Sequence, residues 1–187
     1  MKYEGTYYYR RNDARPPHNG FTSSQLLAQA SAKLGYNLGK SATVYQHENG
    51  KRPSEERGST EGSSPNVGLV EPPTIYEGNF SVQWKYHHEN NSYLRWRGGK
   101  EELDHNGSKQ VEAGNVIFLK TTWSPISKDY INVKTIGSGE AVIYKNGEAV
   151  SGSWEKKRAT DRLVFYDGNR QEIKFATGNI WIETLIK

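Results

Sequence analysis

The dipeptide Asn146-Gly147 is the feature that most constrains the fold of this chain. It lies between two β-prone segments, 141–144 and 149–154. Asparagine and glycine tolerate the positive φ angles of a tight hairpin turn, whose twist matches that of two antiparallel strands. Asp167-Gly168 repeats this arrangement further along the chain. We therefore predict two tight antiparallel hairpins near the C-terminal end.

Residues before these hairpins show the period of two that is typical of strands. Phe80, Val82, Trp84 and Tyr86 alternate with polar residues, and the segment 93–97 follows across a polar turn. Further β-prone runs lie at 116–119, 131–136, 163–166, 173–175 and 180–185. About eight strands at short spacing indicate an antiparallel β sandwich or a barrel-like sheet.

A helix is predicted at residues 23–34, ahead of the strands. Thr22 is a suitable N-cap, and Gln25 completes the pattern of a capping box. Gly35 can adopt the left-handed conformation that ends a helix. The predicted fold class is therefore α+β and mainly β, with one short helix before the C-terminal β domain.

Composition changes sharply in the middle of the chain. Residues 46–74 are rich in Gly, Ser, Pro, Glu and Arg, and such a segment buries too little apolar surface to offset chain entropy. We interpret it as a loop or linker. The predicted organisation is then an N-terminal portion at 1–45, holding a strand, a Pro-His-Asn loop and the helix, and a β domain at 75–187.

The composition also excludes several classes of protein. The chain has 5 Trp, 12 Tyr and 5 Phe, and this aromatic content argues against disorder. It has no cysteine, which excludes disulfides, thiol catalysis and thiolate metal sites. No apolar run approaches the length of about 20 residues that a membrane helix needs.

One segment resembles a known family. Residues 15–23 read RPPHNGFTS, which is similar to the R-x-P-H-N-x-Y/F-T-S segment of the YerB-like family of predicted bacterial lipoproteins. The C-terminal half agrees with the same family at Tyr86…Tyr93-x-Arg95, Asp104, 115–117, 137–141, 146–147, 152–154 and 178–182.

This resemblance implies a domain whose function is unassigned. Members usually carry a signal peptide, a lipid-modified cysteine and most of an N-terminal domain ahead of the Pro-His-Asn segment, and this chain shows none of these. We expect it to comprise the end of the N-terminal domain and the whole C-terminal domain. The resemblance implies an extracytoplasmic, membrane-anchored location for full-length relatives.

The Pro-His-Asn loop holds the first group of candidate functional residues. They are Arg10, Asp13, Arg15, His18 and Asn19. A histidine beside acidic and basic residues near a helix start could act as a general base or bind an anion. The same residues also make a good turn before a capped helix, and we favour this structural interpretation.

A second candidate group lies in the β domain. Tyr93 and Arg95 share one strand face and could form a small polar-aromatic site with Asp104 across the sheet. Equally, Arg95 and Asp104 could form a structural ion pair. We expect most tryptophans to be buried in the core. Trp123 is the exception, because it lies in or beside a predicted loop, and it is our candidate for an exposed ring.

Basic and aromatic residues interleave at 7–15 and at 93–100, a mixture that can bind nucleic acid. We disfavour nucleic acid as a partner, because a net charge of +4 is mild for this role. The pattern instead predicts that Leu94 and Trp96 face the core while Arg95 and Arg97 face solvent.

We predict no metal site and no cofactor. His87 and His88 are adjacent on a strand and therefore point to opposite faces. No phosphate-binding glycine loop and no Gly-x-Ser-x-Gly nucleophile motif occur. We therefore favour a non-enzymatic module that binds an unknown protein or a cell-wall component. The alternatives are part of an enzyme with a site at Arg15, His18 and Asn19, completed by further N-terminal residues, and a nucleic-acid-associated protein that uses the basic aromatic patches.

Overall fold

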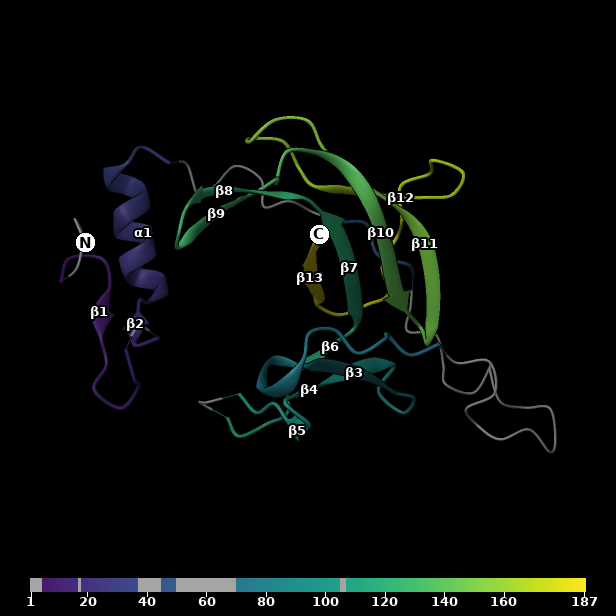
Figure 1. Ribbon diagram of the computed structural model, residues 1–187, viewed down its shortest axis with the longest axis horizontal. Helices are drawn as coiled ribbons and strands as arrows, with labels where there is room; N and C mark the ends of the chain where they lie inside the picture. Colours follow the sequence, from purple (N-terminus) through teal and green to yellow (C-terminus); the bar gives the residue numbers. More distant parts are fainter. Residues whose placement is uncertain (1–4, 17, 37–44, 50–69, 105–106) are drawn as a thin grey trace. The chain divides into compact units, whose positions relative to one another are not determined.

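The computed structural model shows two compact units, Met1–Val44 and Tyr45–Lys187. It describes residues 5–16, 18–36, 45–49, 70–104 and 107–187, and Figure 1 labels their helices and strands. The residues 50–69 of the predicted linker therefore lie outside the described part of the chain. The flanking residues 45–49 belong to the second unit, where His47 forms a β-bridge with Phe175.

The N-terminal unit contains a small hairpin followed by a helix. Strands β1 (Tyr9–Arg10) and β2 (Gly20–Phe21) pair antiparallel, and α1 spans Ser24–Lys33. The helix begins one residue later than predicted, because the Ser23 hydroxyl, 3.2 Å from the Leu26 nitrogen, is the N-cap. Thr22 donates instead to the carbonyl of Tyr7 at 2.6 Å. Gly35 has a φ of 73°, which confirms the predicted left-handed helix end.

A five-stranded sheet forms the centre of the second unit. Its strands in spatial order are β12 (Val164–Asp167), β11 (Glu148–Lys156), β10 (Gly137–Lys145), β7 (Asn115–Thr121) and β13 (Ile180–Ile186). The last strand, β13, pairs parallel with β7, so the antiparallel prediction is wrong for this pair. The two strands are far apart in sequence, and no tight turn fixes their relative direction.

A second sheet and a separate two-stranded ribbon complete the unit. The second sheet contains β3 (Val82–His87), β4 (Ser92–Arg97), β5 (Lys100–Glu101) and β6 (Glu112–Ala113), preceded by the 3-10 turn η2 (Gly78–Phe80). The ribbon pairs β8 (Trp123–Ser127) with β9 (Tyr130–Val133). β8 corrects the prediction of a loop around Trp123.

The predicted Asn146-Gly147 hairpin is confirmed. Lys145 pairs with Glu148 across a two-residue turn, in which Asn146 and Gly147 have φ values of 52° and 71°. The predicted hairpin at Asp167-Gly168 is shorter on its second side. There Tyr166 forms an isolated bridge with Glu172, and 173–175 does not become a regular strand.

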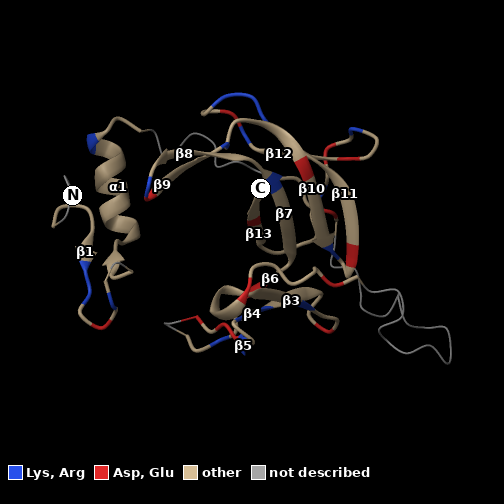
Figure 2. Cartoon of the chain, in the orientation of Figure 1, with Lys and Arg blue, Asp and Glu red and all other residues tan. Residues whose placement is uncertain are grey.

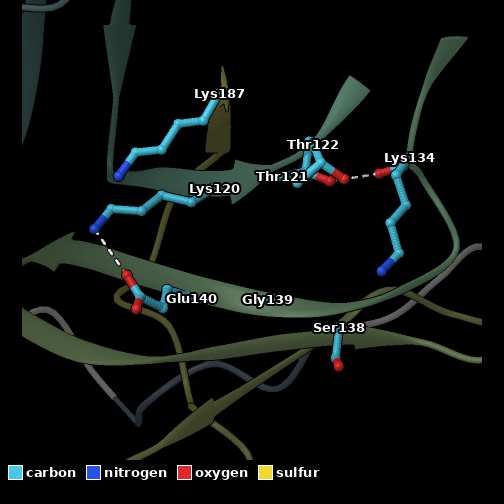
Figure 3. Close-up of a pocket in the computed structure, with 8 residues that line it drawn as sticks. All are labelled: Lys120, Thr121, Thr122, Lys134, Ser138, Gly139, Glu140 and Lys187. Carbon is cyan, nitrogen blue, oxygen red and sulfur yellow. Dashed lines mark hydrogen bonds and ion pairs between the residues drawn. The ribbon is translucent and has the colours of Figure 1, made fainter. Parts of the chain in front are cut away.

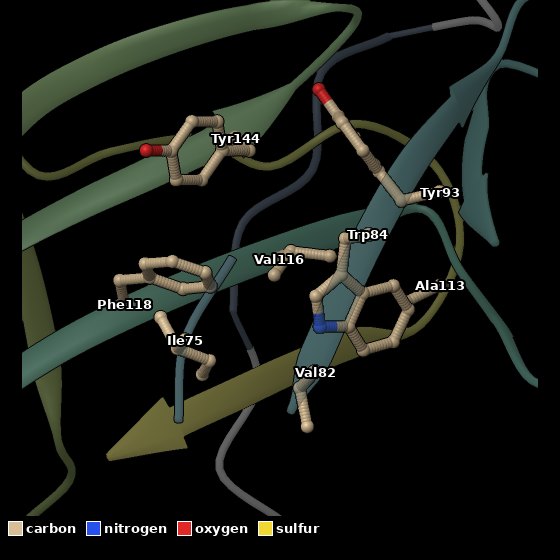
Figure 4. Packing of buried hydrophobic residues seen from close by; sticks show 8 residues of the cluster. All are labelled: Ile75, Val82, Trp84, Tyr93, Ala113, Val116, Phe118 and Tyr144. Atoms are coloured by element: carbon tan, nitrogen blue, oxygen red, sulfur yellow. The ribbon is translucent and has the colours of Figure 1, made fainter. Parts of the chain in front are cut away.

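Two apolar clusters occupy opposite faces of the five-stranded sheet. Figure 4 shows the first, which β7 shares with the second sheet. Its buried members are Ile75, Val82, Trp84, Tyr93, Ala113, Val116, Phe118 and Tyr144. The second cluster contains Ile117, Leu119, Ala141, Ile143, Trp154, Phe165, Ile173 and Phe175. Alternate residues of β7 enter each cluster, which explains its continuous apolar sequence.

These packed sheets confirm the predicted mainly β, sandwich-like fold with one helix. Gly137 and Gly139 both belong to β10. Gly139 is needed there because a Cβ atom at this position would lie 2.6 Å from the Trp154 ring nitrogen. None of the described helices is long and apolar enough to cross a membrane.

Candidate functional site

Asn19 organises the predicted Pro-His-Asn loop. Its side chain is buried and accepts a hydrogen bond from the Arg10 guanidinium at 2.7 Å. The same amide donates to the carbonyl of Arg11 at 3.3 Å, and the Arg11 nitrogen donates back to the carbonyl of Asn19 at 2.9 Å. These contacts close the loop between β1 and β2, so the geometry of Asn19 is that of a turn-forming residue.

The other candidates in this loop lie on its surface. Arg15 and His18 are exposed, and the backbone nitrogen of His18 donates to the carbonyl of Arg15 at 3.0 Å. Asp13 accepts a hydrogen bond from the Arg11 guanidinium at 2.8 Å, and this contact raises the pKa of Arg11. Pro17 lies outside the described residues. A chemical role for these side chains stays a prediction.

Tyr93 and Arg95 lie on the buried face of β4, side by side as the strand period predicted. Both are almost completely inaccessible, whereas Leu94 and Trp96 on the other face are only half-buried. The prediction that Arg95 faces solvent is therefore wrong. An error of one residue in strand phase exchanges the two faces.

Arg95 is neutralised by two carboxylates. Its Nε and Nη2 atoms lie 3.2 and 3.1 Å from Glu183 Oε1, and its Nη1 atom pairs with Glu102 Oε2. Asp104, the predicted partner, caps its own turn by accepting a hydrogen bond from the Gly107 nitrogen at 3.2 Å.

Two tryptophans enclose the Arg95–Glu183 pair. The indole nitrogens of Trp84 and Trp181 donate to Glu183 Oε1 at 3.1 and 3.0 Å. The Arg95 guanidinium also lies 5.0 Å from the centroid of the Trp181 ring. Glu183 lies on β13 and Arg95 on β4, so this cluster joins the two sheets. Because its charges are paired and buried, we assign it to the structure of the core rather than to a reaction.

Glu183 was missed by the sequence analysis. Its only signal is a single acidic residue within an otherwise apolar and aromatic C-terminal strand. No group of three or more His, Asp or Glu side chains with metal-binding geometry occurs among the described residues.

The β8–β9 ribbon is the candidate binding site, and we call residues 123–133 the arm. Cross-strand pairs place Trp123 opposite Val133 and Pro125 opposite Ile131, whereas Ser124 lies opposite Asn132. Because alternate residues point to opposite faces, the first two pairs form an apolar face. The third pair lies on the opposite face, the polar face, which also carries Tyr130.

The apolar face of the arm is open to solvent. Trp123 is 46% exposed and Ile131 is 45% exposed, and Ile126 at the bulge is 69% exposed. In Figure 2 the two strands of the arm carry no charged residue along their length. The prediction that Trp123 is an exposed ring agrees with this geometry. A two-stranded ribbon with one bare apolar face is marginally stable alone and is suited to bind a partner.

Comparisons with known proteins support one family. The chain is 24% identical to "Putative lipoprotein YerB" of Bacillus subtilis (strain 168), over 97% of this chain and 52% of that protein. It also resembles the crystal structure of the YerB protein from Bacillus subtilis, with a TM-score of 0.73 and 18% identity. That match covers 98% of this chain and 58% of the other, so this chain spans about half the length of its relatives.

These comparisons confirm the predicted YerB-like resemblance, and the structural match shows that this chain and the YerB protein share a fold. The name of the curated relative describes a lipoprotein, which implies a membrane-anchored, extracytoplasmic location for that full-length protein. The family model for the C-terminal domain of a protein of unknown function, DUF3048, matches residues 73–182. The chain therefore belongs to the DUF3048 family, of which residues 73–182 form the C-terminal domain.

Proposed function

We propose that this chain is a non-enzymatic protein-binding module of a YerB-like extracytoplasmic lipoprotein. Its contact surface is the apolar face of the arm, and its partner is another protein. The observation that carries the proposal is the exposure of Trp123 and Ile131 on one face of the ribbon, beside Pro125.

The chemistry of this face favours a protein over a glycan. Carbohydrate sites combine a flat aromatic ring with polar groups that bind hydroxyls. Here Trp123 is flanked on its face by Pro125 and Ile131, which offer no hydrogen-bonding side chain. Aromatic and aliphatic residues of this kind form the centres of protein interfaces.

Site-specific photo-cross-linking tests the proposal. A photoreactive amino acid is placed at Ile131, on the apolar face, or at Asn132, on the polar face, in the chain produced in its own cell envelope. We expect illumination to give one discrete adduct from position 131 and much less from position 132. Protease should remove the added mass, whereas cell-wall hydrolase should not.

The adduct should also disappear when Trp123→Ser is added, and persist with the matched polar-face variant Ser124→Ala. Equal adducts from positions 131 and 132, or an adduct removed only by cell-wall hydrolase, would contradict a protein partner at the apolar face.

A further inference from the structure

The strands β7 and β10 separate at one end and form a fork. They pair from Asn115 opposite Lys145 to Leu119 opposite Ala141. Beyond this point β10 continues to Gly137 paired with β11, while β7 continues to Thr121 paired with β13. The sheet is therefore open between the last two residues of β7, Lys120 and Thr121, and the first four residues of β10, 137–140.

The indole of Trp154 holds this fork open. Its ring nitrogen donates to the carbonyl of Lys120 at 2.8 Å and so occupies an acceptor that a neighbouring strand would otherwise use. A Cβ atom at Gly139 would lie 2.6 Å from this carbonyl oxygen, so only glycine leaves room for the indole. The opening is thus built by specific residues.

A pocket of about 240 Å³ lies in the fork, and Figure 3 shows its lining. Lys120 comes from β7, Lys134 from the segment after β9, and Lys187 from the segment after β13. The hydroxyl groups of Thr122 and Ser138 add polar atoms to the same lining. Three separate parts of the chain therefore contribute a lysine to the lining of one pocket.

The charge of this pocket is not balanced within the described residues. Glu140 is the only carboxylate of the lining, and it accepts a hydrogen bond from Lys120 Nζ at 2.9 Å. This bond lowers the pKa of Glu140, and the charge of Lys187 lowers it further. Among the described residues no ion pair joins Lys134 or Lys187 to an acidic side chain, although the charge of Lys187 also acts on Glu140. The side chains of the lining thus comprise three lysines and one glutamate.

The backbone of β10 adds hydrogen-bond donors. A two-residue turn makes Lys145 and Glu148 a hydrogen-bonded pair, and the bonding direction then alternates along the strand. The peptide groups of Ser138 and Glu140 therefore point away from β11 and toward the fork, where β7 has already separated. Neither Ser138 nor Glu140 is paired with a residue of β7.

We propose that the fork is a binding site for a phosphate group. An anion suits this excess of lysine over carboxylate side chains, and the several oxygens of a phosphate can accept bonds from ammonium and hydroxyl donors together. A carboxylate would satisfy fewer of these donors. The group recognised is a phosphate, either as a soluble phosphate or as the headgroup of an anionic lipid.

Titration of the isotope-labelled full chain with inorganic phosphate, at constant ionic strength, tests the site by NMR. We expect saturable shifts at the amides of Ser138, Gly139 and Glu140. Lys134→Ala should weaken binding about tenfold through loss of a charge-assisted bond, and Lys134→Arg should retain it. The matched control is Lys100→Ala, which removes an exposed lysine outside both this pocket and the arm and should leave the affinity unchanged.

Sedimentation with phosphatidylcholine vesicles, with and without phosphatidylglycerol, distinguishes a lipid headgroup from a soluble phosphate as the ligand. Binding that requires phosphatidylglycerol and is lost in Lys134→Ala supports a lipid headgroup, whereas saturable phosphate binding without vesicle binding supports a soluble phosphate. Absence of saturation by phosphate together with absence of vesicle binding overturns the proposal. Equal losses for Lys134→Ala and Lys100→Ala also overturn it.

Discussion

The two ends of the β7–β10 pair differ in how their polar groups are satisfied. At the Asn146-Gly147 end, the Asn146 side chain accepts from Asn91 at 2.9 Å and donates to Glu48 at 3.0 Å. Lys145 pairs with the same Glu48, and the Gly147 nitrogen donates to the Tyr93 hydroxyl at 3.0 Å. At the other end the strands separate, neither Lys134 nor Lys187 forms an ion pair with an acidic side chain among the described residues, and the arm exposes Trp123.

This difference separates the parts of the molecule that maintain the fold from those that remain available for contact. Buried polar groups that bind one another within the chain are expensive to disturb, since removal of one partner leaves the other unsatisfied. Exposed apolar and basic groups gain stability only from a partner. The predictions below test this division.

The largest effect should come from Glu183→Ala, in the cluster that joins the two sheets. This change leaves Arg95 buried with only Glu102 as an acidic partner and removes the acceptor of two indoles. We expect a loss of about 3 kcal/mol in the free energy of unfolding, measured with urea. Glu140→Ala at the fork is the matched control and should have little effect, because the Lys120–Glu140 pair is solvent-exposed. Similar losses of unfolding free energy in both variants would contradict the division between the buried cluster and the exposed fork.

Asn146→Ala should give the next largest effect. Alanine cannot replace the two side-chain hydrogen bonds, and it adopts the φ of 52° poorly. We expect destabilisation of about 2 kcal/mol by urea unfolding. Asn132→Ala, on the polar face of the arm, should change stability by less than about 0.5 kcal/mol. If Asn146→Ala left the free energy of unfolding unchanged, the hydrogen bonds at the Asn146-Gly147 end would not contribute to stability.

Gly139→Ala tests the boundary between the two ends. Its new methyl group would displace the Trp154 indole from the Lys120 carbonyl. We expect a loss of about 1.5 kcal/mol, because an extra methyl group is forced into a packed site. Gly168→Ala is the control, since no atom lies within 4 Å of the Cβ position there. Retention of stability and of the tryptophan fluorescence spectrum in Gly139→Ala would contradict the role given to the indole.

Acid should produce the smallest of these changes in stability. The bond from Arg162 lowers the pKa of Glu172 below its ordinary value of 4.5. The pair therefore stabilises the folded state above about pH 4.5, and this contribution is lost as the pH falls through the folded pKa. Urea unfolding between pH 6 and 3 should show a slightly shallower decline in Glu172→Gln than in the parent chain. An equal decline in stability in both chains would contradict the contribution assigned to the Arg162–Glu172 pair.

Several features of the fold could be predicted because their causes are local. The Asn146-Gly147 turn requires positive φ angles at two adjacent residues, and these residue types supply them. Gly35 ends the helix for a similar reason. The β-prone run at 116–119 lies within β7, and its residues are buried on both faces of that strand.

The features that could not be predicted depend on distant residues. Arg95 is buried because of Glu183, which lies 88 positions away, and nothing in the local alternation of β4 indicates that partner. The segment around Pro125 suggested a loop, although a two-stranded ribbon tolerates proline at its edge. The lysines of the fork come from three separate segments, so their proximity has no local signal.

The central claim is that the apolar face of the arm is left uncovered by the described residues of its own unit and is available to a partner. Urea unfolding of the double variant Trp123→Ser, Ile131→Ser tests this claim most directly. The exposure of both side chains predicts a change of less than about 1 kcal/mol, since substitutions at exposed positions are usually small in effect. A loss of about 3 kcal/mol or more, as for a buried pair of this size, would show that the chain itself covers this face.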